Sequence, residues 1–120
     1  MKILLIEDNE LNLDMLSRRL ERKGFTTISA TDGVAGIEKA KKENPELIIM
    51  DLSLPILNGW DAAKKLKENN ETMSIPIIAL TAHAMKGDKE KAINAGCDEY
   101  DTKPVDFERL LEKISKVTGS

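Results

Sequence analysis

Five short apolar runs recur along this chain of 120 residues, and they constrain its fold more than any other feature. They are KILLI (2–6), FTTIS (25–29), ELIIM (46–50), PIIAL (76–80) and the weaker CDEYD (97–101). Runs that are apolar almost throughout, rather than alternating with polar residues, indicate strands buried on both faces of a parallel sheet. Parallel strands need crossover connections, which are usually helices, so helical segments should lie between the runs.

The segments between and after these runs have helical spacing. Residues 11–23 place Leu13, Leu16 and Leu20 on one face and stop at Gly24, a residue suited to ending a helix. Similar patterns predict helices over 33–43, 60–68, 88–95 and 106–117. Five repeats of strand and helix predict an α/β fold, namely a doubly wound, flavodoxin-like sandwich with a five-stranded parallel sheet in the order 2-1-3-4-5.

Composition excludes several classes of protein for what we expect to be a single domain of residues 1–120. The 18 basic and 21 acidic residues are interleaved, so there is neither a nucleic-acid-binding surface nor a polybasic membrane patch. No segment resembles a signal peptide or approaches the length of a membrane span. Cys97 is the only cysteine, which rules out an internal disulfide and suits a reducing compartment. We therefore expect a cytoplasmic protein without direct nucleic-acid contact or membrane insertion.

Polar side chains follow four of the five predicted strands. They are Glu7 and Asp8 after the first strand, Asp51 after the third, Thr81 after the fourth and Lys103 after the fifth. In open α/β sheets, the carboxyl ends of the strands form the ligand crevice where the strand order reverses. Asp51 taken alone could be a turn residue that accepts backbone hydrogen bonds. Convergence of three carboxylates, a hydroxyl and an ammonium group favours a binding site instead.

The charges of this predicted site indicate its ligands. Three neighbouring carboxylates repel one another unless a cation or protons neutralise them. Oxygen ligands suit a small hard cation such as Mg²⁺, which keeps waters that a phosphate oxygen can replace. Lys103 is a flexible cation that can pair with Asp51 when the site is empty and with an anion when it is filled. The predicted pocket therefore suits a phosphoryl group.

Four segments of the sequence carry a family resemblance. They are EDN (7–9), MDLSLPILNG (50–59), LTAHA (80–84) and YDTKP (100–104), and they resemble the receiver domain of two-component response regulators over essentially the whole chain. Within the CheY-like superfamily, the stretches EDNELN, TAHAMKGD and AGC are most similar to stand-alone DivK-type regulators and to receivers of hybrid kinases.

The resemblance implies a phosphoacceptor site. Asp51 would attack the phosphorus of a phosphohistidine and form an acyl phosphate. Asp8 and Asp51 would bind Mg²⁺ through their side chains, Glu7 through a water, and Ser53 through its backbone carbonyl. The cation and Lys103 would stabilise the charge on the transferring phosphoryl group.

Several neighbouring residues have roles implied by the same resemblance. Thr81 would donate a hydrogen bond to the phosphoryl group, and the small Ala82 would leave room beside it. A cis peptide bond between Lys103 and Pro104 would direct the lysine inward. His83 would lie at the rim of the site, where it lacks the partners that a metal ligand needs.

Tyr100 occupies the position of the family's switch aromatic, three residues before Lys103. The implied response is a population shift in which Thr81 moves toward the phosphoryl group and Tyr100 turns inward. This would reshape the surface formed by the fourth helix, fifth strand and fifth helix, where a downstream protein target would bind. The alternative is that Tyr100 is simply a half-buried strand residue.

The implied phosphoryl donor is a sensor histidine kinase or a histidine phosphotransfer protein. It would dock on the outer face of the first helix, which we expect Asn9 and Asn12 to cap. Because phosphoryl acceptance and loss would be self-catalysed, we expect no turnover of a free substrate and do not class the chain as an enzyme.

Other classes of protein fit the sequence less well. A flavin carrier would need a Ser/Thr/Gly-rich phosphate loop where this chain has Glu7 and Asp8. Neither G-x-G-x-x-G nor a Walker loop is present for a dinucleotide or nucleoside triphosphate. A phosphatase with an aspartyl nucleophile would need a cap over its substrate, and no segment encodes one. The remaining alternative is a receiver-like scaffold that is never phosphorylated and acts only by binding.

Overall fold

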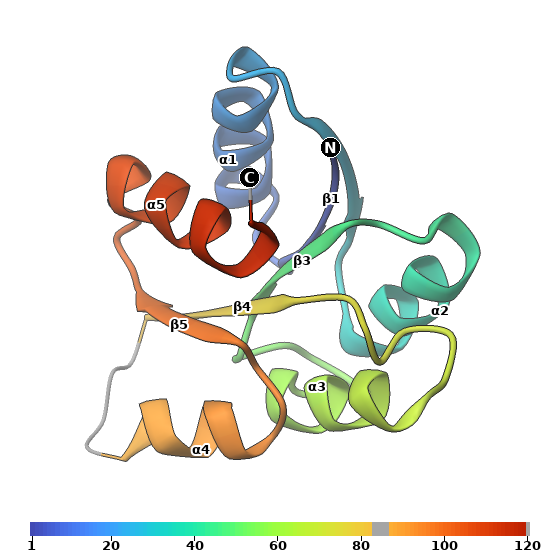
Figure 1. The fold of residues 1–120 in the computed structure, drawn as a ribbon. Helices are drawn as coiled ribbons and strands as arrows, with labels where there is room; N and C mark the ends of the chain where they lie inside the picture. Colours follow the sequence, from blue (N-terminus) through green and yellow to red (C-terminus); the bar gives the residue numbers. More distant parts are fainter. Residues whose placement is uncertain (83–86, 120) are drawn as a thin grey trace.

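The computed structural model describes residues 1–82 and 87–119, which form a five-stranded parallel sheet with helices on both sides (Figure 1). The elements are β1 (Lys2–Ile6), α1 (Glu10–Arg22), β2 (Thr26–Ala30), α2 (Gly33–Glu43), β3 (Leu47–Asp51), α3 (Gly59–Glu68), β4 (Ile77–Thr81), α4 (Asp88–Asn94), β5 (Glu99–Thr102) and α5 (Phe107–Thr118). The strand order is β2-β1-β3-β4-β5. The predicted doubly wound, flavodoxin-like α/β fold is therefore confirmed.

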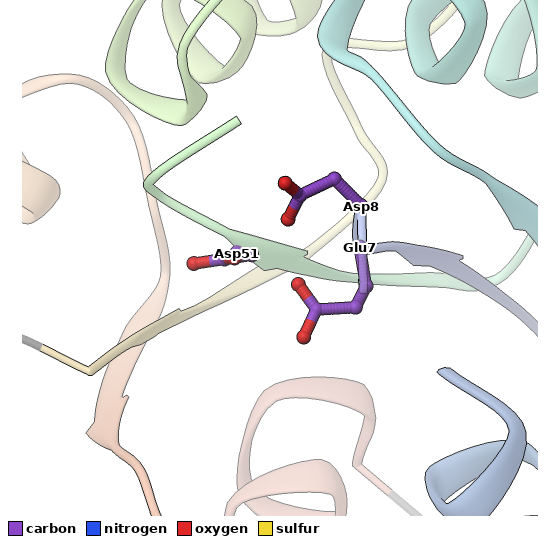
Figure 2. Close-up of side chains that lie close together, drawn as sticks. All are labelled: Glu7, Asp8 and Asp51. Carbon is purple, nitrogen blue, oxygen red and sulfur yellow. The ribbon is translucent and has the colours of Figure 1, made fainter. Parts of the chain in front are cut away.

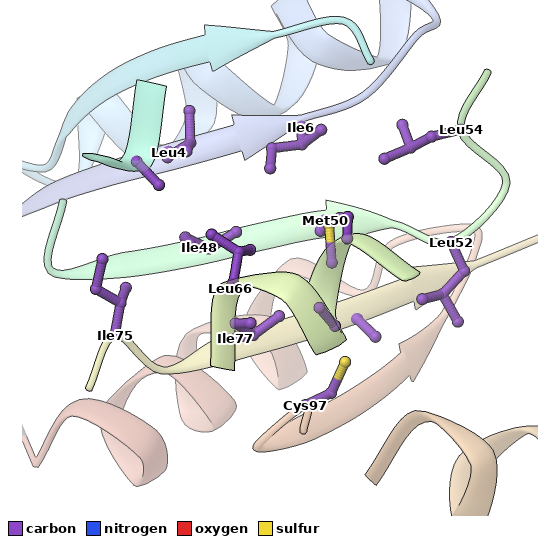
Figure 3. Close-up of a cluster of buried hydrophobic side chains, with 14 of the residues drawn as sticks. Leu4, Ile6, Ile48, Met50, Leu52, Leu54, Leu66, Ile75, Ile77 and Cys97 are labelled. Atoms are coloured by element: carbon purple, nitrogen blue, oxygen red, sulfur yellow. The ribbon is translucent and has the colours of Figure 1, made fainter. Parts of the chain in front are cut away.

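Two apolar clusters, one on each face of the sheet, hold its layers together. Helices α1 and α5 cover one face, and α2, α3 and α4 cover the other (Figure 1). In the second of these layers, Leu66 of α3 packs beside Ile48 and Ile77 of the central strands (Figure 3). On the opposite face, Leu20 of α1 and Ile114 of α5 are buried in the other cluster. Because helices cover both faces, the central strands have apolar side chains on both.

Strand boundaries differ from the prediction by one or two residues. Strands β3 and β4 extend to include Asp51 and Thr81, because both residues remain in register with a neighbouring strand. Strand β5 begins at Glu99 and not at residue 97, since the N–H of Cys97 donates to the carbonyl of Ala92 and continues the end of α4. Asp51 and Thr81 are thus the last residues of their strands, at the edge of the sheet that forms the crevice.

The expectation that every strand is buried on both faces is wrong for the two outer strands. In β2 only Ala30 is buried, and in β5 buried and half-buried residues alternate. Both strands lie at an edge of the sheet, so the helical layers cover them incompletely. All residues of β3 and β4, which lie inside the sheet, are buried.

The ends of α1 are largely as predicted. The side chain of Asn9 accepts the N–H of Asn12 at 3.0 Å and caps the helix. Gly24, with a φ of +94°, follows the C-cap residue Lys23 in the left-handed conformation that glycine favours. Asn12 is not a second capping side chain as predicted, because its amide group contacts Glu7. Across the described ranges, no helix has the length and apolarity needed to cross a membrane.

Candidate phosphoacceptor and cation site

Three carboxylates lie together at the carboxyl edge of the sheet (Figure 2). Glu7 and Asp8 follow β1, and Asp51 ends the adjacent strand β3. One oxygen atom from each carboxylate lies within 4.8 Å of the other two. Glu7 and Asp51 are buried, whereas Asp8 is exposed. The predicted convergence of these acids is therefore present, and their mutual repulsion favours a cation between them.

Lys103 reaches this cluster from the fifth strand's end. Its Nζ lies 2.6 Å from Oε1 of Glu7 and 3.5 Å from Oδ2 of Asp51. The sequence predicted a pair with Asp51, but Glu7 is the closer partner because its longer side chain reaches the ammonium group. Burial lowers the pKa of Lys103, but the Glu7 and Asp51 carboxylates outweigh this and leave that pKa raised. Lys103 therefore remains a cation beside the acids.

Glu7 has the most unusual environment of the three acids. Burial and the nearby Asp51 raise its pKa, although Lys103 opposes this. Its Oε1 accepts hydrogen bonds from Lys103 and from the side-chain amide of Asn12, at 2.6 and 3.2 Å. Its Oε2 is buried and has no hydrogen-bond partner within the described part of the chain. A cation among the carboxylates would provide a ligand contact for Oε2 of Glu7 and would reduce the repulsion between the three acids. These residues therefore fit Mg²⁺.

Asp51 combines turn chemistry with a position in the site. Its Oδ1 accepts the backbone N–H of Ser53 at 3.1 Å, which is the turn interaction considered from the sequence. Its Oδ2 faces Lys103. The two interpretations are therefore compatible, since each concerns a different oxygen. Ser53 lies in the exposed loop that follows β3, and the role of its carbonyl in binding a cation stays a prediction.

Gly59 holds the loop after β3 close to the site. Its N–H donates to the carbonyl of Leu52 at 3.0 Å where α3 begins. A Cβ atom on Gly59 would lie only 2.6 Å from Cα of Leu52 and 2.7 Å from the carbonyl oxygen of Asp51. Only glycine therefore allows α3 to start so close to the end of β3.

The remaining predicted site residues lie at the ends of β4 and β5. Thr81 is buried at the end of β4, and its carbonyl accepts the N–H of Lys103 at 2.8 Å. This bond ties the two strand ends together and places Lys103 in the crevice. Ala82 is exposed beside it, and the Lys103–Pro104 peptide bond is cis. His83 lies outside the described residues.

Tyr100 lies half-buried in β5 and packs against the apolar cluster on the α3 and α4 side of the sheet. Burial raises the pKa of its phenol, and so does the carboxylate of Asp88 at the start of α4. The side chain of Tyr100 is thus near α4, beneath the surface of α4, β5 and α5 that the sequence predicted to change on phosphorylation. Its role as a switch stays a prediction.

The predicted pocket at the acids continues into a cavity of about 370 Å³, whose apolar walls the sequence did not predict. Leu5, Ile49 and Leu80 of the sheet line it together with Met15 of α1 and Val105, and it also reaches Glu7, Asp51 and Lys103. Its walls come from segments far apart in the chain, so no local pattern could have revealed it.

The sequence also did not predict a set of ion pairs between β5 and α5. Asp101 is buried and binds Arg109, with Nε to Oδ1 at 2.9 Å and Nη2 to Oδ1 at 2.8 Å. Glu99, also buried, binds Lys113 and Lys116. The sequence does contain a pattern that could have predicted these ion pairs. Two acids two residues apart lie on one face of a strand, and three basic residues recur at helical spacing.

This fold and acidic cluster define a doubly wound α/β protein with a crevice at its strand ends that is lined by three carboxylates. Residues 3–115 match the model of the response regulator receiver domain, and the chain belongs to this family.

Individual relatives agree with this assignment. The chain is 38% identical over 117 residues to the polar-differentiation response regulator DivK of Brucella anthropi, across 98% of this chain and 95% of that protein. The receiver domain of sensor histidine kinase PA1611 from Pseudomonas aeruginosa, solved with magnesium coordinated in its active site cleft, is similar with a TM-score of 0.91 and 33% identity, covering 99% and 98% of the two chains. The receiver domain of Saccharomyces cerevisiae Ssk1, solved with the histidine phosphotransfer protein Ypd1, has a TM-score of 0.90 and 32% identity, covering 99% and 89%. The predicted likeness to DivK-type regulators is thus confirmed.

Proposed function

We propose that this protein is a phosphoacceptor response regulator of a two-component system or phosphorelay. Asp51 receives a phosphoryl group in the presence of Mg²⁺, and the phosphorylated form presents a changed protein-binding surface. The observation that carries this proposal is the convergence of Asp51 with two further carboxylates and with the cation Lys103. The magnesium in the active site cleft of the PA1611 receiver supports the choice of metal.

The proposed reaction is a transfer between two side chains. One carboxylate oxygen of Asp51 attacks the phosphorus of a phosphohistidine, so that an O–P bond forms and the N–P bond breaks. The leaving imidazole takes up a proton. Bound Mg²⁺, held by Asp8, Asp51, Glu7 and the Ser53 carbonyl, would supply positive charge to the phosphoryl oxygens.

The other residues of the site bind or position the transferred group. Lys103 turns its ammonium group from the carboxylates to a phosphoryl oxygen, and the Thr81 hydroxyl donates to another. Ala82 leaves space beside Thr81. Hydrolysis of the acyl phosphate ends the signal, so the protein turns over no free substrate and we do not class it as an enzyme.

The proposed donor is a sensor histidine kinase or a histidine phosphotransfer protein. The outer face of α1 supports this proposal, because Leu11 and Met15 are 77% and 57% exposed there and lie one helical turn apart. Met15 also lines the cavity that reaches Asp51. The complex between the Ssk1 receiver and Ypd1 is consistent with a donor of this kind.

We also place the protein in the cytoplasm, since a reducing compartment suits its single cysteine, Cys97.

The proposed output is a protein–protein contact through α4, β5 and α5. Strand β5 lies at an edge of the sheet, with α4 and α5 on its two sides (Figure 1). Tyr100 packs beneath the α4 side of this surface, one strand away from Thr81. A shift of Thr81 toward a phosphoryl group would open space for Tyr100 to move inward and would bias the surface between two states.

Intact-protein mass spectrometry after incubation with Mg²⁺ and acetyl phosphate tests this function. We expect the wild type to gain the mass of one phosphoryl group and Asp51→Asn to gain none. A matched control is Asp14→Asn, which removes an exposed carboxylate that pairs with Arg18 on the same helix and should label like the wild type. Absence of labelling in the wild type, or undiminished labelling of Asp51→Asn, would overturn the proposal and favour the non-phosphorylated scaffold.

A further inference from the structure

Asn12 contacts the acidic cluster although it is not one of the predicted site residues. It lies in the first turn of α1, where its backbone N–H donates to Oδ1 of the capping residue Asn9. Its side-chain Nδ2 points the other way and donates to Oε1 of Glu7 at 3.2 Å. One residue thus links the start of α1 to the acid at the end of β1.

The two oxygens of Glu7 have different surroundings. Oε1 accepts both the Asn12 amide and the Lys103 ammonium group, at 3.2 and 2.6 Å. Oε2 is buried and has no hydrogen-bond partner among residues 1–82 and 87–119. Because two donors on Oε1 restrict rotation of the carboxylate, they also fix the direction of Oε2. Glu7 is therefore held with one oxygen satisfied and one available.

We propose that Asn12 is a positioning residue of the cation site and acts through Glu7. This inference rests on the proposed function, in which Lys103 leaves the carboxylates to bind the phosphoryl group. After that movement, Asn12 is the side-chain donor that still holds Oε1 of Glu7. Without Asn12, Oε1 of Glu7 would keep only the Lys103 contact of the two seen among the described residues, and would lose that one as well when Lys103 departs. In both states the cation would bind a less ordered set of oxygens.

Mg²⁺ titrations followed by backbone amide NMR shifts test the proposal without any phosphoryl donor. Asn12→Leu removes the donor at nearly constant volume and should raise the dissociation constant for Mg²⁺ about 5- to 10-fold, near the low end for residues that orient metal ligands. Asn12→Ala should behave alike. Because Asn12 is exposed, both variants should fold.

Asn9→Ala is the matched control for α1 stability. It removes the helix cap but leaves the Asn12 amide and Glu7 in place, so the protein should lose thermal stability with a change in Mg²⁺ affinity below about twofold. If Asn9→Ala weakens Mg²⁺ binding as much as Asn12→Leu does, the effect arises from the helix and the proposal fails.

A double-mutant cycle separates action through Glu7 from other causes. In a Glu7→Ala background, which removes the acceptor of the Asn12 amide, the further change Asn12→Leu should leave Mg²⁺ affinity unchanged. An equal loss in both backgrounds, or no loss in either, would overturn the proposal. Failure of the proposed function itself has a different signature, because the wild type would then bind no Mg²⁺ or would take up no phosphoryl group from acetyl phosphate.

Discussion

Replacing Glu99 by glutamine should destabilise the protein in a pH-dependent way. The Glu99 side chain is buried in β5, with Oε1 at 3.2 Å from Nζ of Lys113 and Oε2 at 3.1 Å from Nζ of Lys116. The backbone N–H of Tyr100 also donates to Oε1 at 3.1 Å. These contacts attach α5 to the edge strand of the sheet, so their loss should weaken the packing of that helix.

The lowered pKa of Glu99 gives the size of the expected loss in the free energy of unfolding. Burial alone would raise this pKa, but the hydrogen bonds from Tyr100, Lys116 and Lys113 outweigh burial and lower it from 4.5 to about 2. One pKa unit corresponds to about 1.4 kcal/mol, so this lowering represents about 3 kcal/mol of stabilisation. The Lys116 side chain is 74% exposed, so solvent screens its interaction with Glu99 and reduces its contribution to this stabilisation. We therefore expect Glu99→Gln to lower the free energy of unfolding by about 2 kcal/mol near neutral pH.

The sign of the pH dependence follows from the lowered pKa. Charged Glu99 stabilises the folded state fully above the unfolded-state pKa of 4.5, and this contribution is lost as the pH falls toward about 2. Urea unfolding of the wild type and Glu99→Gln, at several pH values between about 7 and 3, measures the difference directly. The two curves should be furthest apart near neutral pH and should approach each other as the pH falls from about 4.5 to 3.

A matched control is Glu112→Gln on the exposed face of α5. It changes the net charge equally and should alter the free energy of unfolding by less than about 0.5 kcal/mol at every pH. A difference between wild type and Glu99→Gln that stays constant from neutral to acid pH would refute the reasoning, because uncharged packing would then account for the stabilisation.

Two further predictions concern the loop between β3 and α3. Gly59→Ala should lower the free energy of unfolding by about 1–3 kcal/mol, since the added Cβ meets the backbone of Leu52 and Asp51. Gly36→Ala should cost less in the same urea assay, because the nearest atoms to its added Cβ belong to the side chain of Ile6 and not to the backbone. Ile56→Gly should raise the melting temperature and stabilise the fold by about 0.5–1 kcal/mol, because Ile56 has a φ of +68° in a tight turn and its side chain is 81% exposed. Destabilisation by Ile56→Gly would show that its exposed side chain makes a stabilising contact.

The site could be predicted in large part because a parallel sheet brings the carboxyl ends of its strands to one edge. Glu7, Asp51 and Thr81 end or follow the three central strands, so the fold alone gathers them, whatever their rotamers. The pairing of Lys103 is different. Its shorter contact is with Glu7 and not with the predicted Asp51, because side-chain length and the direction of the β5 end decide which oxygen it reaches.

Burial at the edges of the sheet is a second property that the sequence did not predict correctly. The run from residue 25 to 29 predicted a fully buried strand, but β2 has only one buried residue because it lies at the edge of the sheet and pairs with β1 alone among the described strands. At the other edge, the acids of β5 are buried although acids rarely are, since Arg109 and Lys113 of α5 pair with them. Position in the sheet, which no single segment encodes, decides both outcomes.

The sequence by itself determined the alternation of strands and helices, the cap at Asn9 and the acids at the strand ends. Each depends on residues within a few positions of one another, where spacing and local hydrogen bonding suffice. Only the tertiary structure decided that Lys103 contacts Glu7, 96 residues away, and that Asn12 binds the same oxygen. Contacts of this kind depend on how whole elements pack, so their partners are selected by distance in the folded chain and not by order along it.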